Sequence, residues 1–211
     1  MKALLALHYL PNLEYFAIVA QAEKTILEKH EQYVKQSYRN RCYINTANGP
    51  HRLVVPVTDK HGKALMREVH IDNSTRWRDN HWRAVSSAYG KAPFFEHYAD
   101  GLRGIWSGRH QSLYSLNMDL LSFCLQSLQL SITLTESTSY QKSPNDGITD
   151  LRSALSPKNP HSGREYYSPV PYAQVFGNKF ASNLSVLDVL FCEGPNAAHV
   201  IKSSIRGDLN K

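Results

Sequence analysis

The first 28 residues carry the pattern that most restricts the fold. An apolar run at 3–8 predicts a buried strand, and Pro11 breaks it. Apolar side chains recur at helical spacing over 13–22, and a second strand begins at 25–27. A strand, a tight turn, a helix and a second strand form a βαβ unit, whose two strands run parallel. A ligand crevice is expected at the carboxyl ends of such strands.

The pattern that follows extends this unit into one α/β domain over residues 1–202. A hairpin is expected across Asn48-Gly49, because turn residues separate two short apolar runs. We expect a small, mostly parallel sheet that starts with the βαβ unit, with helices packed on it. The sequence predicts further strands at 41–45, 53–57, 69–71 and 132–134, and helices at 77–89, 94–104, 112–130, 184–191 and 196–202.

Residues 137–172 change character and are rich in Pro, Ser, Asn and Lys. We expect an irregular Pro-rich segment that wraps the surface, with one helical turn at 151–155. So long an irregular stretch in a compact domain is usually functional or disordered. Residues 203–211 are predicted to form a frayed polar tail.

The composition of the chain restricts the classes of ligand and partner that we expect it to bind. The formal charge of +6 favours anionic small molecules, and without a Lys/Arg-rich run nucleic acid is not the expected partner. Three widely spaced cysteines indicate neither a disulfide framework nor a zinc knuckle, and free thiols fit a reducing cytoplasm. We expect no metal site, because the histidines are scattered and no HExxH motif occurs. No apolar run approaches the ~20 residues of a membrane span, so a cytoplasmic, soluble protein is expected.

The stretch from Glu28 to Gly49 is dense in tyrosine and arginine, which is typical of a recognition surface. The alternative is an edge strand with a solvated basic face. As substrate-binding candidates we take His30, Tyr33, Lys35, Tyr38, Arg39, Asn40 and Arg41. The cationic members would bind an anion, the tyrosines would stack on a sugar or base, and the Asn would orient it.

His8 ends the first predicted strand, where α/β folds bind ligands, so it is the candidate general base. The alternative is a core histidine that bonds to the backbone. Arg76 and His81 are further candidates at a helix start that carries three arginines. A bound anion would offset their repulsion with the helix dipole, or Asp72 and Asp79 would do so.

The acidic residue Asp188 lies in an apolar segment. A structural role is favoured for it, with Arg or backbone N–H groups as the natural partners.

Residues 8–12, residues 28–41 and the 76–83 helix start are expected to converge on one cleft. The alternative is a closed structural network, in which Glu28, Glu31 and Asp79 pair with Arg39, Arg41 and Arg76.

Several stretches in order resemble the WbqC-like protein family. They are HEQYVKQSYRNRCYINTANGP at 30–50, RWRDNHWRAVSSAYGKAPFFEHY at 76–98, LYSLNMDLLSF at 113–123 and NLSVLDVLFCEGPNA at 183–197. DLRSALSPKNP at 150–160 and YAQVFGNKF at 172–180 are similar to its Bacteroidetes-type branch. Many members open with an HQPNYLPW-like motif. Here LHYLPNLEYF at 7–16 keeps His8 and Pro11 and departs at the Gln-Pro pair and the Trp.

The resemblance implies a link to bacterial surface-polysaccharide synthesis and transfer of an amino-acyl (glycyl) group to a sugar. It specifies no cofactor and no catalytic residue. The leading hypothesis is an acyl or group transferase that acts on a nucleotide-linked or phosphate-linked sugar. The alternatives are a non-catalytic module that binds a ligand or a protein of the same pathway, and, third, a nucleic-acid binder.

Overall fold

The computed structural model describes residues 1–58, 64–159, 165–177 and 179–206. It confirms the α/β class and the parallel start of the sheet. Strand β1 (Lys2–Ala6) leads into α1 (Leu13–Gln21), and the chain returns in β2 (Lys24–Glu28), which pairs with β1 in parallel. Asn12 caps α1 by accepting a hydrogen bond from the Tyr15 amide.

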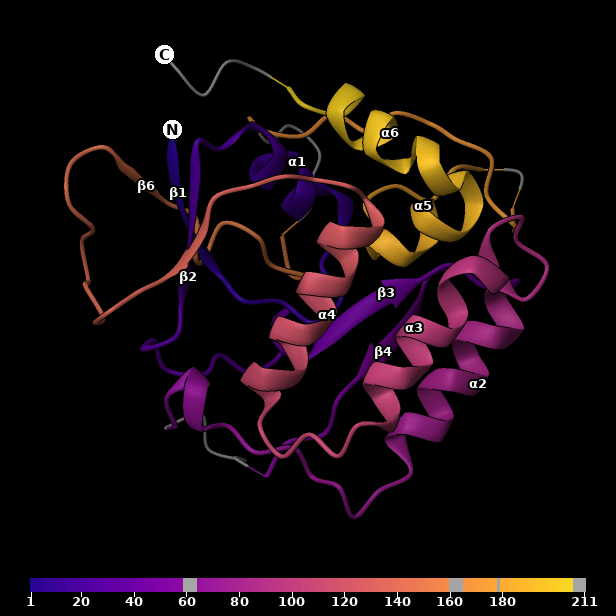
Figure 1. The fold of residues 1–211 in the computed structure, drawn as a ribbon, viewed down its shortest axis with the longest axis horizontal. Coiled ribbons are helices and arrows are strands. Elements are labelled where there is room, and N and C mark those ends of the chain that lie inside the picture. Colours follow the sequence, from indigo (N-terminus) through magenta and orange to yellow (C-terminus); the bar gives the residue numbers. More distant parts are fainter. Residues whose placement is uncertain (59–63, 160–164, 178, 207–211) are drawn as a thin grey trace.

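The parallel sheet has the strand order β5-β2-β1-β6. Strand β5 (Leu134–Glu136) pairs with β2, and β6 (Ile148–Asp150) pairs with β1, both in parallel. The first two strands of the chain therefore lie inside the sheet, and the edge strands come more than a hundred residues later. In Figure 1 this sheet lies at the left of the molecule and the helices α2 to α4 lie to its right.

One part of the predicted irregular stretch needs correction. Residues 137–172 contain a strand, β6, which pairs with β1. The paired residues are Lys2 with Ile148, Ala3 with Thr149, and Leu4 with Asp150. A strand of three residues is too short to show a periodicity, so partner pairing alone defines it. Residues 160–164 of that stretch lie outside the described residues.

The predicted hairpin forms from β3 (Arg41–Ile44) and β4 (His51–Val54), with Cys42 opposite Leu53. Gly49 has φ +89°, the left-handed value that this tight turn requires. The expected strand at 69–71 is wrong. This segment follows a short 3₁₀ turn, η1 (Met66–Glu68), and makes isolated bridges, one between Val57 and Ile71 and one between His70 and Ser112.

Helices α2 (Trp77–Tyr89), α3 (Phe95–Ser107) and α4 (Leu113–Ser127) confirm the helical middle of the chain. Helix α5 (Val186–Glu193) begins at the Ser185 cap, and η2 (Gly194–Asn196) connects it to α6 (Ala197–Ser203). Buried side chains from α1, α4 and α5 join the sheet in one hydrophobic core.

The predicted frayed tail is wrong at its start. Ser204 is fully buried, and Ile205 forms a bridge with Tyr167. The rest of the predicted tail, residues 207–211, lies outside the described residues.

Candidate functional site

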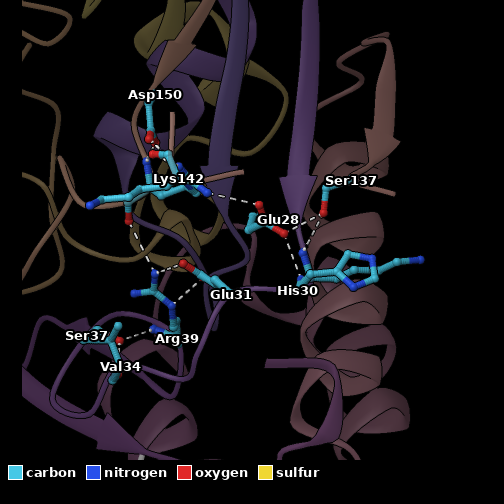
Figure 2. Close-up of polar contacts among 11 residues, drawn as sticks. Glu28, His30, Glu31, Val34, Ser37, Arg39, Ser137, Lys142 and Asp150 are labelled. Carbon is cyan, nitrogen blue, oxygen red and sulfur yellow. Dashed lines mark hydrogen bonds and ion pairs between the residues drawn. The ribbon is translucent and has the colours of Figure 1, made fainter. Parts of the chain in front are cut away.

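The four parallel strands end in polar residues that meet at one edge of the sheet. Residue His8 follows β1, Glu28 ends β2, Ser137 follows β5, and Asp150 ends β6. We call this group, with Glu31, Arg39 and Arg152, the carboxyl-edge cluster. Figure 2 shows most of its polar contacts. Open α/β sheets bind their ligands outside this end of the strands.

Glu28 ties three segments together. Its side chain is fully buried, and Oε1 accepts hydrogen bonds from the Ser137 hydroxyl at 2.6 Å and from the His30 amide at 2.8 Å. Its Oε2 accepts from Arg152 Nη1 at 3.2 Å. A buried carboxylate needs such partners, so Glu28 fixes β2 against the segments that follow β5 and β6.

Glu31 and Arg39 form a buried bidentate ion pair. The Arg39 Nε and Nη2 atoms donate to the two Glu31 carboxylate oxygens at 2.7 and 2.6 Å. The Arg39 side chain is 4% exposed and the Glu31 side chain is 8% exposed. Burial raises the pKa of Glu31, although the hydrogen bonds and charge of Arg39 oppose that rise. The fork geometry makes this pair specific as well as strong.

Arg152 is the second arginine of the cluster. It donates to Asp150 through Nε at 2.9 Å, and its guanidinium carbon lies 4.9 Å from the centre of the Tyr140 ring. The hydrogen bonds from Arg152 lower the pKa of Asp150 and raise the pKa of Arg152 itself. With Glu28 and Asp150 both bound to it, Arg152 is fully paired.

His8 is a buried member of the cluster and is 1% exposed. Its ring centre lies 5.0 Å from that of Tyr15 and 5.5 Å from that of Tyr38, and its Nδ1 atom has no hydrogen-bond partner among the described residues. Burial, assisted by the charge of Arg39, lowers the pKa of His8 well below its ordinary value. His8 is therefore a neutral imidazole at neutral pH, with one nitrogen free to accept or donate.

His30 stands at the surface side of the cluster. Arg67 Nη1 lies 3.0 Å from His30 Nδ1, and arginine can only donate, so Nδ1 accepts and the ring proton sits on Nε2. Nε2 has no partner among the described residues. A depression of about 630 Å³ opens here, lined by His30, Glu31, Gln32, Val34, Arg39, Leu65, Tyr140 and Ser153. That volume lies in the range of about 300–1,000 Å³ that small-molecule sites occupy.

Other residues of the 28–49 stretch point elsewhere. Tyr33 is 4% exposed and belongs to the hydrophobic core. Asn40 donates to the Val55 carbonyl at 2.8 Å and so anchors β4. Arg41 is half-buried in β3, and its Nε has no partner in the part of the chain that the structure describes. Lys35 is exposed. The Tyr38 carbonyl accepts from the Tyr9 amide at 2.9 Å, which places this segment beside the end of β1.

The start of α2 does not join the cluster. Arg76 is 80% exposed at its side chain and pairs with Asp79 at 3.2 Å. His81 faces inward, where the Tyr9 hydroxyl lies 2.8 Å from its Nδ1. Of the three segments expected to converge, the structure brings together those at 8–12 and 28–41. Of the alternative network, the pairs Glu31–Arg39 and Arg76–Asp79 form, but Glu28 pairs with Arg152 and not with Arg41.

The sequence analysis missed the cluster members Ser137, Asp150 and Arg152, and it missed Tyr140 in the lining of the depression. All four lie within the segment expected to be irregular. One signal was available: Asp150 and Arg152 place an acid and an arginine two residues apart. Within the described residues, no group of three or more His, Cys, Asp or Glu side chains could hold a metal ion. No helix in the described ranges is long and apolar enough to cross a membrane.

Comparisons with known proteins show which family the chain belongs to. The family model of the WbqC-like protein family matches residues 7–170. "Uncharacterized protein Rv1507c" of Mycobacterium tuberculosis is 35% identical over 152 residues, which cover 70% of this chain and 64% of that protein. No solved structure matches the chain. The family model matches well over half of the chain, and the chain therefore belongs to the WbqC-like protein family.

Proposed function

We propose that the carboxyl-edge depression binds an anionic small molecule, a nucleotide-linked or phosphate-linked sugar, and that the chain transfers an acyl group to or from it. The resemblance to the family suggests an amino-acyl (glycyl) group and a role in surface-polysaccharide biosynthesis. The observation that carries the proposal is the position of the depression, which opens at the carboxyl ends of parallel strands beside Arg39 and the Tyr140 ring.

In this proposal the acceptor's hydroxyl or amine attacks the carbonyl carbon of an activated acyl donor. A new C–O or C–N bond forms, the donor's leaving group departs with its electron pair, and the acceptor's proton passes to His8 Nδ1. A neutral imidazole is the form that accepts a proton, which the lowered pKa of His8 provides. His8 is 1% exposed and does not line the depression, so the acceptor reaches it only if a neighbouring side chain moves.

The ligand has a direct test. We expect a nucleotide sugar, a nucleoside triphosphate or an acyl donor to raise the melting temperature in a thermal-shift screen. Tyr140→Ala should weaken that response, because Tyr140 is 53% exposed, lines the depression and contributes little to the core. Lys202→Ala, on α6, is the matched surface control. A flat response to every ligand, or an equal response in both variants, contradicts the site.

The general base has a separate test. His8→Ala should abolish turnover with the ligand that the screen identifies, while the ligand still shifts the melting temperature. Turnover equal to that of the unaltered chain would remove His8 from the mechanism and leave the binding site standing.

A second candidate function is a non-catalytic binding module of the same pathway. It is supported by the full pairing of Arg39 and Arg152 with carboxylates, since a paired arginine has few donors left for a substrate anion. This candidate predicts a stable complex with another protein of the pathway in pull-down experiments. It also predicts that Tyr140→Ala lowers the yield of that complex and that His8→Ala does not.

A further inference from the structure

A second depression, remote from the carboxyl edge, lies between α2 and α3. Its volume is about 170 Å³, and it is lined by Arg78, Asp79, Trp82, Arg103, Trp106 and Ser107. We call it the α2–α3 arginine pocket. It shares no lining residue with the carboxyl-edge depression. In Figure 1 the two helices stand side by side at the right of the molecule.

Aromatic rings hold the two arginines of this pocket. The Arg78 guanidinium carbon lies 4.9 Å from the centre of the Trp77 ring, and that of Arg103 lies 5.1 Å from the centre of the Trp82 ring. Trp82 in turn packs edge-on against Trp106 with 6.5 Å between ring centres. An arginine that stacks by its face keeps its N–H groups, which lie in the guanidinium plane, for an acceptor.

No carboxylate of the described residues pairs with either arginine. Among the described residues, neither Arg78 nor Arg103 has a carboxylate oxygen within 4.0 Å, and the Nε and Nη2 atoms of Arg78 are buried without a hydrogen-bond partner. Asp79 lines the pocket but already pairs with Arg76 at 3.2 Å. Buried donors on a charged group nearly always find an acceptor, so this arrangement lacks one.

A third arginine, Arg109, adds positive charge near Arg78. Burial, and then the nearby charge of Arg109, lowers the pKa of Arg78. Both influences disfavour the guanidinium charge, and a bound anion would relieve them. Ser107 adds a hydroxyl to the lining.

We propose that the α2–α3 arginine pocket binds the oxyanion end of a small molecule, a phosphate or a carboxylate group. The pocket is smaller than the roughly 300–1,000 Å³ that a whole drug-sized ligand needs, so it takes the anionic group while the rest of the ligand lies outside. This site goes beyond the proposed function and does not depend on it.

Binding in this pocket can be measured by tryptophan fluorescence. It has three tryptophans, and Trp82 and Trp106 line the pocket while Trp77 carries Arg78. Titration with inorganic phosphate, and separately with acetate, at constant ionic strength should give a saturable change in tryptophan emission. Saturation by phosphate alone assigns the pocket to a phosphate group, and saturation by acetate alone assigns it to a carboxylate.

A matched pair of variants locates the binding. Arg103 is exposed on α3, so Arg103→Gln should fold normally and weaken binding by at least about tenfold, the effect of one lost charge-assisted hydrogen bond. Lys202→Gln, on α6, removes an equal charge from a surface residue outside the pocket lining, and should leave the affinity unchanged.

Three results would overturn the proposal. They are a linear response to both anions, an equal loss of affinity in Arg103→Gln and Lys202→Gln, and tight binding of a single-stranded oligonucleotide for which phosphate does not compete. Circular dichroism of each variant separates loss of the pocket from loss of the fold. If Arg103→Gln is unfolded, Ser107→Ala takes its place and should weaken binding in the same direction.

Discussion

Trp106, Tyr9, His81 and Val54 form a buried hydrogen-bond chain whose directions are set by chemistry. The Val54 carbonyl only accepts, so His81 Nε2 donates to it at 3.2 Å, and His81 Nδ1 must accept from the Tyr9 hydroxyl at 2.8 Å. Trp106 Nε1 then donates to the Tyr9 oxygen at 3.0 Å. Every donor is used once, which requires a neutral His81. The sequence analysis predicted that this histidine binds a substrate, because the spacing of residues on a helix does not reveal which face packs against the core.

The buried hydrogen bonds of His81 predict that the stability of the protein depends on pH. Burial lowers the pKa of His81 from 6.5 to about 4, although the Val54 hydrogen bond opposes the shift. Below pH 6.5 His81 becomes protonated in the unfolded chain but stays neutral in the folded chain. The free energy of unfolding therefore falls as the pH drops from 6.5 towards 4. At about 1.36 kcal/mol per unit, the loss approaches 3 kcal/mol. Urea unfolding of the unaltered chain and of His81→Gln should show the smaller loss in the variant. Equal losses would contradict the assignment.

The Glu31–Arg39 pair predicts a second residue-scale effect. Arg39→Met leaves the Glu31 carboxylate buried without its partner, and loss of one member of such a pair costs about 3–5 kcal/mol. The double variant Glu31→Leu/Arg39→Met removes both charges and should recover most of that free energy of unfolding, measured by urea denaturation. A double variant as unstable as the single one would show that the carboxylate is not the cause.

At the scale of elements, α5 is fixed at both ends. Near its start, Asp188 is fully buried and accepts from the Tyr89 and Tyr172 hydroxyls at 2.8 and 2.6 Å and from Gln174 Nε2 at 2.7 Å. A structural role for Asp188 was expected from its apolar neighbours, but with Arg or backbone N–H groups as partners. Its partners are neutral side chains, two of them in the 172–181 segment, so burial raises the pKa of Asp188.

The end of α5 predicts a steric effect. Gly194 has φ +52°, and a Cβ placed on it would lie 2.4 Å from the Phe94 ring. Gly194→Ala should therefore lower the free energy of unfolding by at least about 2 kcal/mol, through backbone strain and overpacking. Gly104→Ala is the control, because it lies in α3 with nothing within 4 Å and should stabilise the chain by about 0.5–1 kcal/mol. Thermal unfolding of both variants measures the contrast.

At the scale of the whole molecule, local pattern predicted the long elements and long-range pairing decided the rest. The βαβ start was predictable because helical and strand periodicities alternate over 28 residues. Strand β6 was not, since its three residues form a strand only by pairing with β1. The same limit explains the site: the 28–41 half was visible as a dense polar stretch, whereas Arg152 enters only when β6 is placed beside β1.

The strand order has a consequence for the time course of folding. Strands β1 and β2 are synthesised first but lie inside the sheet, and neither has its outer neighbour until residues 134–150 have been made. Until then the β1–β2 pair has two open edges, which can pair with other chains. A fragment that ends at residue 130 should therefore self-associate in analytical ultracentrifugation, and one that stays monomeric would contradict this. The 211-residue chain should refold slowly for its size, because its sheet closes only through contacts distant in sequence.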